Sequence, residues 1–335
     1  MFILGMDIGY SNLKLVWGES DAKKPTMAVY PSGAAPADCI STSITSGGDR
    51  GGFKVGVNGE EYVAGIEQSS IEGWERVLSK EYPFSIDYKA LLHARLMATA
   101  RDKIDTLVTG LPVEQCADKA YKERVEKLLQ GRHEISPGRF VVVHKVFVIP
   151  QPVGAYIDYL MSCDNPDVVS ASRVLVIDPG FFSVDYCAID KGSFDKASSG
   201  SSQEAMSVLL EEAGKLITLD HGRPFDLASI EDAVRGDMQV PVFGKMVNLA
   251  PYLTLAATNV AEAVMRKVRQ NLRRSKVQGA DFTLLAGGGA DLYKQSASTI
   301  MEGSQVVTAY DPVITNAKGF FEYGRSYGYN WCLRI

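Results

Sequence analysis

Apolar residues in this chain form short continuous runs, which predict buried β-strands, and longer stretches with helical spacing, which predict amphipathic helices. The runs with strand character cover residues 2–6, 13–17, 105–109, 140–149, 174–177, 186–189 and 281–285. Helices are predicted over residues 88–103, 119–130, 153–161 and 253–274. The pattern therefore places the polar motifs of the chain at the ends of buried strands.

Two pairs of strands enclose a turn that begins with aspartate and contains glycine. The first turn starts Asp7-Ile-Gly9 and the second starts Asp178-Pro-Gly180. Glycine allows the backbone to approach a ligand closely. Two such turns could bind a polyphosphate through backbone N–H groups, while Asp7 and Asp178 hold a hydrated cation. An ordinary Asp-Pro-Gly hairpin turn is the alternative interpretation of the second motif.

A third motif follows the strand predicted over residues 281–285. Three consecutive glycines, Gly287, Gly288 and Gly289, lie between this strand and a predicted helix. Bare backbone at this point allows a planar ring or a sugar to lie against the chain. A lone run of three glycines is often a flexible turn, but its place after two Asp-x-Gly turns indicates a nucleotide site.

Two local signals mark the ends of other elements. Asn58-Gly59 predicts a tight hairpin turn, and the pattern Ser201-x-x-Glu204 predicts a capping box for the helix that follows. The helix predicted over residues 253–274 ends in a basic stretch. These cations either complement the helix dipole or reach a nucleotide.

In this order, the motifs resemble those of the actin-like ATPase superfamily and, within it, the plasmid-segregation actins of the ParM/StbA family. The resemblance extends over nearly the whole chain and is carried by residues 11–21, 110–113, 286–290 and 310–319. It implies an α/β, actin-like (ribonuclease H-like) fold in which two similar domains flank a nucleotide cleft. The implied parts are domain I over 1–162 with a small subdomain inserted at about 25–85, domain II over 163–312 with a subdomain inserted at about 198–275, and a C-terminal segment, 313–335, that returns to domain I.

The resemblance also implies ATP and Mg²⁺ as ligands, with GTP as an open alternative to ATP. Asp7 and Asp178 would position Mg²⁺ through water molecules, and Gln151, with Asp178, would orient the attacking water. The residues that would contact the nucleotide are Asp7, Gly9, Tyr10, Ser11, Asn12 and Lys14 in the first loop, Gly180, Phe181, Ser183 and Asp185 in the second, and Gly287, Gly288 and Gly289 in the third.

Two positions depart from the family pattern. The second loop has Phe181, Phe182 and Ser183 where the family usually has another glycine and a threonine, and Pro179 is also atypical. Gln151 stands where the segregation actins commonly have glutamate and actin has glutamine. Glutamine can orient a water molecule, but it cannot act as a general base.

The expected function is an ATPase that assembles head to tail into dynamic filaments and uses hydrolysis as a timer. By resemblance, such a filament moves plasmid DNA through a centromere-binding adaptor protein, without touching the DNA itself. A small-molecule kinase of the same superfamily is one alternative, although no second aspartate motif for an acceptor is evident. A nucleotide-switched scaffold with negligible turnover is the other. No GxxxxGK[ST] motif occurs, which argues against a P-loop NTPase.

Composition limits the partners and the compartment. The chain has 335 residues, 46% apolar content and a net charge of −5, which argue for two domains with real cores and against unspecific nucleic-acid binding. No apolar run is long enough to span a membrane, and the N-terminus lacks the basic region of a signal peptide. Five scattered cysteines show no metal or disulfide spacing, so a reducing cytoplasm is expected.

Overall fold

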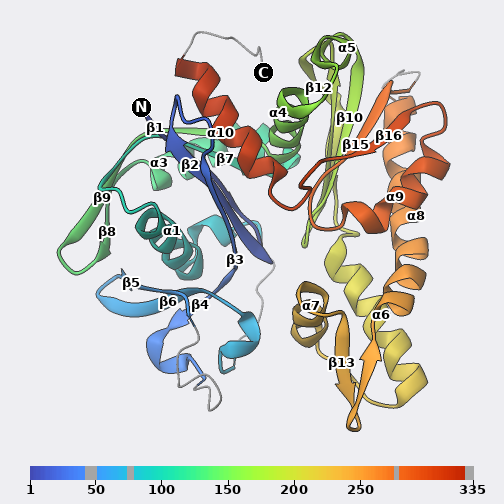
Figure 1. Ribbon diagram of the computed structural model, residues 1–335, viewed down its shortest axis with the longest axis horizontal. Coiled ribbons are helices and arrows are strands. Elements are labelled where there is room, and N and C mark those ends of the chain that lie inside the picture. Colours follow the sequence, from blue (N-terminus) through green and yellow to red (C-terminus); the bar gives the residue numbers. More distant parts are fainter. Residues whose placement is uncertain (42–50, 74–78, 275–278, 329–335) are drawn as a thin grey trace. The chain divides into compact units, whose positions relative to one another are not determined.

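Two β-sheets, each in a unit of its own, organise the molecule (Figure 1). The computed structural model describes residues 1–41, 51–73, 79–274 and 279–328, so residues 329–335 of the expected C-terminal segment lie outside the described ranges. The first unit consists of Met1–Asp158 together with the segment that begins at Ile314, and the second runs from Tyr159 to Val313. Within the described ranges, the chain therefore passes from one unit to the other twice.

The main sheet of the first unit has the strand order β3-β2-β1-β7-β9-β8, in which β1, β7 and β9 are parallel to one another. Its strands are β1 (Phe2–Ile8), β2 (Asn12–Glu19), β3 (Thr26–Pro31), β7 (Lys103–Leu111), β8 (Gly131–Ser136) and β9 (Arg139–Pro150). A smaller sheet in the order β4-β6-β5 contains β4 (Gly33–Pro36), β5 (Phe53–Val57) and β6 (Glu60–Ile66). The helices are α1 (Ile86–Ala98), α2 (Val113–Ala117), α3 (Lys119–Leu129) and α10 (Thr315–Gly328), and α4 (Gln151–Ser162) contains the first passage to the second unit.

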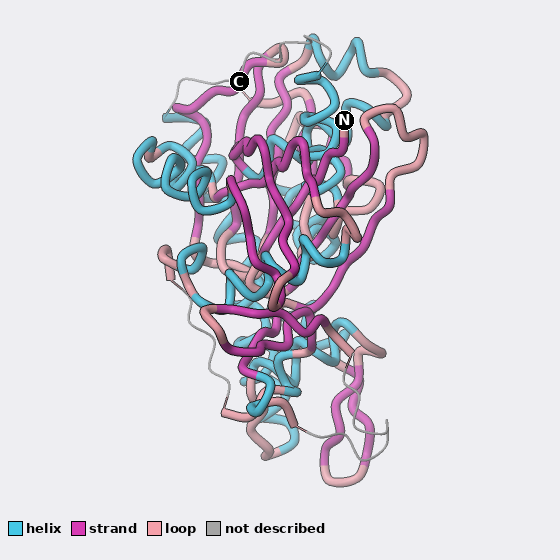
Figure 2. Tube along the Cα trace, turned by 90° about the vertical axis from the view of Figure 1, so that its left-hand side faces the viewer, coloured by secondary structure: helices cyan, strands magenta, loops and turns pink. Residues whose placement is uncertain are grey.

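The main sheet of the second unit has the order β12-β11-β10-β15-β16, with β10, β15 and β16 parallel to one another. Its strands are β10 (Arg173–Pro179), β11 (Val184–Asp190), β12 (Ser193–Ser202), β15 (Phe282–Leu285) and β16 (Gln305–Thr308), and a separate hairpin pairs β13 (Gln239–Val242) with β14 (Lys245–Asn248). The helices are α5 (Pro166–Ala171), α6 (Met206–His221), α7 (Leu227–Arg235), α8 (Ala250–Arg274) and α9 (Ala290–Ile300). Figure 2 distinguishes these helices from the strands by colour.

The two main sheets repeat one plan. In each, the first strand of the unit lies inside the sheet. The next two strands continue from it on one side, each antiparallel to the strand before it, and two later strands lie parallel to it on the other side. Asp7 and Asp178 lie near the carboxyl ends of these first strands. The sequence prediction of two similar halves is therefore confirmed, and Asp7 and Asp178 occupy matching places in the two sheets.

The alternation of side chains along β1 explains why this strand is apolar throughout. Every second residue from Phe2 to Ile8 faces the core that contains α1, whereas Ile3 packs with Ala317 and Phe321 of α10 on the other face. A side chain at Gly5 would lie 2.4 Å from the carbonyl oxygen of Ala317, so glycine is needed where α10 crosses the strand. Figure 1 shows α10 against β1 and β2.

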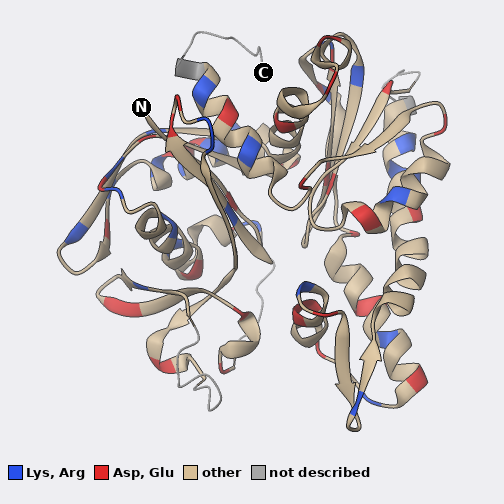
Figure 3. Cartoon of the chain, viewed as in Figure 1, with Lys and Arg blue, Asp and Glu red and all other residues tan. Residues whose placement is uncertain are grey.

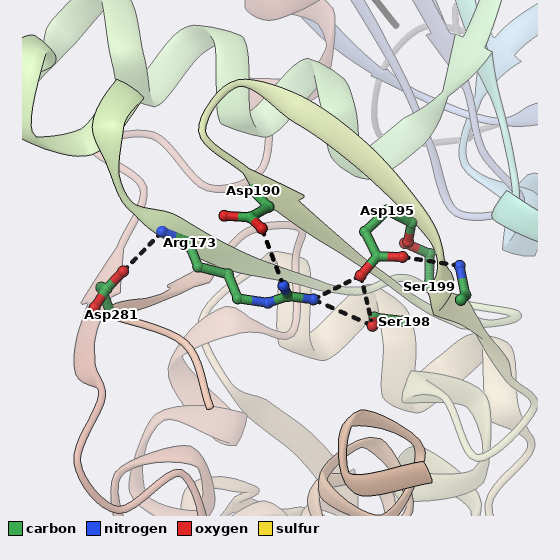
Figure 4. Close-up of polar contacts among 7 residues, drawn as sticks. Arg173, Asp190, Asp195, Ser198, Ser199 and Asp281 are labelled. Carbon is green, nitrogen blue, oxygen red and sulfur yellow. Dashed lines mark hydrogen bonds and ion pairs between the residues drawn. The ribbon is translucent and has the colours of Figure 1, made fainter. Parts of the chain in front are cut away.

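A polar cluster joins β10, β11 and β12 of the second unit to Asp281, the residue before β15, at the start of β10, the end opposite Asp178 (Figure 4). The guanidinium of Arg173 contacts Asp190 at 3.4 Å and Asp195 at 2.6 Å, and its backbone N–H donates to Asp281 at 2.7 Å. The hydroxyl of Ser198 donates to Asp195 at 2.8 Å. This cluster stabilises the sheet and lies outside the candidate site.

His93 of α1 makes the first unit sensitive to acid. Its buried ring contacts the carbonyl oxygen of Gly56 through Nδ1 at 2.7 Å, and its Nε2 has no hydrogen-bond partner among the described residues. Burial lowers the pKa of His93 to about 4. Because the unfolded chain then binds a proton that the folded chain does not, the free energy of unfolding is expected to fall between about pH 6.5 and pH 4, by up to about 1.4 kcal/mol per pH unit.

Urea denaturation at pH 7 and pH 5 measures this loss. His93→Gln should reduce the difference between the two pH values, whereas the same change at the exposed His144 should leave it intact. An equal pH dependence in both variants would show that His93 is not the group that titrates.

None of the helices in the described ranges combines the length and the apolar character needed to cross a bilayer.

Candidate functional site

Asp7 is the centre of a polar cluster at the carboxyl ends of the parallel strands of the first sheet. It is 2% exposed and lies directly opposite Lys14 in the register of β1 and β2. The Lys14 ammonium contacts one carboxylate oxygen at 2.9 Å, and the Gln151 amide nitrogen donates to the other at 3.2 Å. The parallel strands β1, β7 and β9 bring these groups together, because α4 begins where β9 ends. Two of the predicted site residues, Lys14 and Gln151, thus contact a third, Asp7.

Gly110 determines where the Gln151 side chain can lie. A Cβ atom at Gly110 would approach Cγ of Gln151 to 2.6 Å and the ring of Phe320 to 2.4 Å. The glycine at the end of β7 therefore leaves the space that Gln151 occupies beside the sheet. This contact gives a physical reason for a glycine at the start of the motif over residues 110–113.

The first loop is closed by its backbone. The N–H of Gly9 donates to the carbonyl oxygen of Asn12 at 3.1 Å, and the Asn12 amide donates to the Ser11 hydroxyl at 3.3 Å. Ser11 and Asn12 therefore lie together at the tip between β1 and β2, as the sequence predicts for neighbouring residues of one loop.

Tyr10 anchors this loop to the rest of its unit. Its hydroxyl donates to the carbonyl oxygen of Ser79 at 2.5 Å, and its ring stacks on Tyr82 with the ring centres 4.4 Å apart. Its own carbonyl oxygen accepts hydrogen bonds from Ser32 at 2.6 Å and from Gln68 at 3.0 Å. Burial raises the pKa of Tyr10 to about 12. Tyr10 was predicted as a nucleotide contact, but its side chain is engaged within the protein, and sequence reasoning missed these four partners.

The second hairpin pairs two aspartates, Asp178 and Asp185, directly opposite each other on β10 and β11. Both are buried. Asp185 accepts hydrogen bonds from the hydroxyls of Ser183, at 2.6 Å, and Ser201. The Ser183 hydroxyl is therefore directed to Asp185, so a phosphate contact from this residue would come from its backbone.

The predicted capping box over Ser201 and Glu204 is wrong. Ser201 belongs to strand β12, and α6 begins later, at Met206, without a side-chain cap. The first N–H groups of α6 are satisfied by the second loop instead. Met206 N–H donates to the carbonyl oxygen of Gly180 at 3.1 Å, and Ser207 N–H donates to that of Phe181 at 3.0 Å.

The unusual residues of the second loop serve the packing of the unit. Phe181 is half-buried and packs against the core beneath α6. The carbonyl oxygen of Pro179 accepts a hydrogen bond from Gly289 at 3.2 Å. The N–H of Gly180 lies 2.9 Å from the carbonyl oxygens of both Asp178 and Ser183, which makes the turn tight. The second loop is thus joined to both α6 and the glycine loop.

The three glycines after β15 have different surroundings. Gly287 has a φ of +73°, and a Cβ atom there would lie 2.1 Å from a carboxylate oxygen of Asp178. A Cβ atom at Gly289 would lie 2.7 Å from the sulfur of Met206. At Gly288 no atom lies within 4 Å of the added Cβ, and the backbone is not left-handed. Packing explains Gly287 and Gly289, which leaves Gly288 as the position where close approach of a ligand is the remaining reason for glycine.

Glu204 and Lys267 add a charged pair beside the glycine loop. The ammonium of Lys267 lies 3.5 Å from the Glu204 carboxylate and 3.2 Å from the Ser202 hydroxyl, and the carbonyl oxygen of Glu204 accepts a hydrogen bond from Tyr293 of α9. Lys267 comes from the basic end of α8, one of whose cations was predicted to reach a nucleotide. Glu204 was missed, because the sequence pattern assigned it to a helix cap.

The chain matches two known domain families, one in each half. Residues 5–154 match the family of actin-like protein N-terminal domains, and residues 176–298 match the C-terminal domain family of archaeal MreB-like actin homologues. Both halves of the chain thus match domain families of actin-like proteins. The two matches follow each other and together take in both candidate hairpins. No curated protein matches the chain.

Solved structures of actin-like proteins resemble the chain over almost its whole length. An archaeal actin homologue in complex with ADP has a TM-score of 0.73 and 18% identity, and the match covers 97% of this chain and 99% of that one. A Clostridium botulinum ParM from a 15-stranded filament has a TM-score of 0.70 and 18% identity, with the same coverage. A Bacillus thuringiensis ParM with ATP has a TM-score of 0.62 and 13% identity, covering 98% and 100%.

These likenesses confirm the predicted actin-like fold. They do not single out the plasmid-segregation branch, since the archaeal homologue is as similar to this actin-like chain as the ParM structures are.

Proposed function

We propose that this actin-like protein binds ATP with Mg²⁺, assembles into filaments and hydrolyses the nucleotide as a timer for disassembly. The observation that carries the proposal is the cluster of Asp7, Lys14 and Gln151, together with the equivalent position of Asp178 in the second unit. The filament and the ATP-bound structures among the related proteins support the same function.

Both units would contribute to the nucleotide contacts. In the first, Gly9, Ser11 and Asn12 would bind phosphate oxygens, and Lys14 would divide its charge between Asp7 and the phosphates. In the second, the backbone of Gly180, Phe181 and Ser183 would bind them, with Asp185 holding the Ser183 side chain in place. The nucleoside would lie against Gly288, where the structure leaves room. Glu204 and Lys267 would contact its sugar.

The residues present fit a hydrated Mg²⁺. Described His, Cys, Asp and Glu residues form no cluster of three or more that could hold a metal directly. Mg²⁺ needs none, because it keeps several waters and is usually held by one or two carboxylates and the phosphates of the substrate. Asp7 and Asp178 would supply these carboxylates through water. The ion would neutralise charge that develops on the phosphates.

Gln151 would orient the attacking water. Its amide nitrogen donates to Asp7, which fixes the side chain, and its amide oxygen can accept a hydrogen bond from water. An amide cannot take the proton from that water, so hydrolysis would rest on positioning and on charge stabilisation. Hydrolysis without a general base suits slow turnover of ATP after assembly.

The proposed role is DNA segregation through a centromere-binding adaptor protein. A net charge of −5 favours an adaptor over direct binding to DNA. Within each unit, acidic and basic residues of the described chain are interspersed (Figure 3). A protein that is captured from cell extracts in the presence of the nucleotide, and is lost when the nucleotide is omitted, would be identified as the adaptor.

Right-angle light scattering and phosphate release, recorded together after addition of MgATP, test the proposal. Scattering should rise with ATP, decay as phosphate appears, and require Mg²⁺. Phosphate release without any scattering would exclude filament assembly. Phosphate transfer that requires a small-molecule acceptor would identify the chain as a kinase instead. Scattering without phosphate release would favour the nucleotide-switched scaffold.

Replacing Gln151 with alanine should separate assembly from hydrolysis. We expect phosphate release to fall about 100-fold, because one positioned group is lost from the transition state. ATP-dependent scattering should still rise and should then persist. Gln295→Ala, on the exposed face of α9, is the matched control and should behave like the unchanged protein. Normal release by Gln151→Ala would remove Gln151 from the mechanism.

A further inference from the structure

The turn between β13 and β14 exposes an aromatic residue in an unfavourable conformation. Phe243 has a φ of +46° and is 76% exposed, and Gly244 beside it has a φ of +79°. The left-handed region is sterically disfavoured for bulky residues. Figure 1 shows this hairpin projecting from the second unit.

The same chain has a second hairpin that uses the preferred residues for this turn. Asn58 and Gly59 join β5 to β6 with φ values of 54° and 90°. Phe243 occupies the place of that asparagine in the β13–β14 hairpin. Since Phe243 neither favours the turn nor packs in the core, a contact outside the subunit is the reason that remains for its presence.

Other exposed apolar residues adjoin Phe243. Pro241 and Met246 lie opposite each other on β13 and β14, and both are exposed, whereas Val240 and Val242 face the core. We call Pro241, Phe243 and Met246 the hairpin knob. Lys245 follows the turn and has no ion pair within the described ranges.

A groove of about 650 Å³ lies between α6 and α7 of the same unit. Its apolar lining comes from Leu219, Pro224, Phe225, Leu227 and Ile230, and Leu219 is 82% exposed. Gly214 also lines the groove, and a Cβ atom there would lie 2.8 Å from Cδ1 of Ile230. We call this feature the α6–α7 groove.

Charge and geometry indicate that the knob fits the groove of another copy. Glu211 and Lys215 both line the groove, but Lys215 contacts Glu212 at 3.6 Å, whereas Glu211 has no ion pair among the described residues. The carboxylate of Glu211 therefore complements Lys245 beside the knob. A hydrogen bond of 3.0 Å from Arg223 to the carbonyl oxygen of Pro241 fixes the hairpin relative to the start of α7. The exposed ring of Phe243 is not in its own groove.

We infer that Phe243 of one subunit inserts into the α6–α7 groove of the next, with Lys245 facing Glu211. This inference rests on the proposed filament and names a surface for it. A subunit that offers its knob to one neighbour keeps its own groove open for another. Such a contact is heterologous and continues as an open chain.

Phe243→Asn tests the knob without weakening the hairpin. Asparagine prefers the left-handed region, so thermal stability should stay the same or rise slightly. The critical concentration for MgATP-dependent scattering should rise at least about tenfold, because a buried aromatic contact is lost. Leu219→Lys should block the groove with a similar effect. Leu255→Lys, on the exposed part of α8, is the matched control and should assemble normally.

Mixing the two variants distinguishes a head-to-tail contact from other arrangements. Phe243→Asn keeps a working groove, and Leu219→Lys keeps a working knob. Each alone should sediment as a monomer with MgATP, whereas an equimolar mixture should form heterodimers that do not grow. Exchanging the charges, Lys245→Glu with Glu211→Lys, should restore the assembly that either change alone weakens.

The results separate this inference from the proposed function. If the unchanged protein assembles with MgATP and Phe243→Asn assembles equally well, the inference is wrong and the filament stands. A mixture that remains monomeric also overturns it. If the unchanged protein never assembles, the proposed function fails and the inference fails with it.

Discussion

Asp7→Asn is expected to lower phosphate release at least about 1,000-fold. The substitution removes the carboxylate that would hold Mg²⁺ through water, and it changes the group that fixes Gln151. It also removes the negative charge that contacts the ammonium of Lys14, which is 15% exposed. Losing one partner of a buried ion pair typically costs about 3–5 kcal/mol, so the free energy of unfolding should fall as well.

A second variant separates these two effects. Asp7→Asn combined with Lys14→Met removes both charges, so stability should largely return while phosphate release stays low. Glu61→Gln is the control, because Glu61 forms an ion pair with Lys54 at 3.7 Å in the same unit and both side chains are exposed. That change should cost at most about 1 kcal/mol and leave release unchanged. Recovery of release in the double variant would show that Asp7 acts only through stability.

Gly287→Ala is expected to disrupt the second half of the site. The new methyl group would lie 2.1 Å from the Asp178 carboxylate, and alanine would have to adopt a φ of +73°. The clash and the backbone strain together should cost about 2–5 kcal/mol, and Asp178 would have to move from its position. Equilibrium dialysis with labelled ATP should therefore show no binding at protein concentrations where the unchanged chain is saturated.

Gly288→Ala is the comparison variant, because it tests ATP binding without a change in stability. A methyl group at Gly288 meets no protein atom, so denaturation by urea should match that of the unchanged protein. ATP affinity should nevertheless fall about tenfold, because the methyl group occupies the surface that we assign to the nucleoside. Unchanged affinity in Gly288→Ala would place the nucleoside elsewhere.

The parts of the site that lie close together in the sequence could be predicted. The two Asp-x-Gly turns, the strands beside them and the glycine loop follow from short apolar runs and from turn residues, which act locally. The pairing of Asp7 with Lys14 was also within reach, since counting outward from the turn places these two residues opposite each other. The sequence interpretation instead assigned Lys14 to the phosphates alone.

The contacts between distant segments could not be predicted in the same way. Ser201 contacts Asp185 only because of the register of β11 and β12, and a bulge interrupts that register. Its spacing from Glu204 matched a capping box, but carbonyl groups of another loop had taken that role. The contact between Gln151 and Asp7 likewise depends on the order of β1, β7 and β9 in the sheet.

The capping of α6 by the second loop has a mechanical consequence. The carbonyl oxygens of Gly180 and Phe181 fix the first turn of a helix that spans Met206–His221, about 24 Å. Its later turns, from Glu211 to Leu219, form one wall of the groove. A helix moves as a rigid rod, so any displacement of the loop is carried to that wall. Under the proposed function, helix α6 would act as a lever that carries the chemical state of a bound nucleotide to a neighbouring subunit.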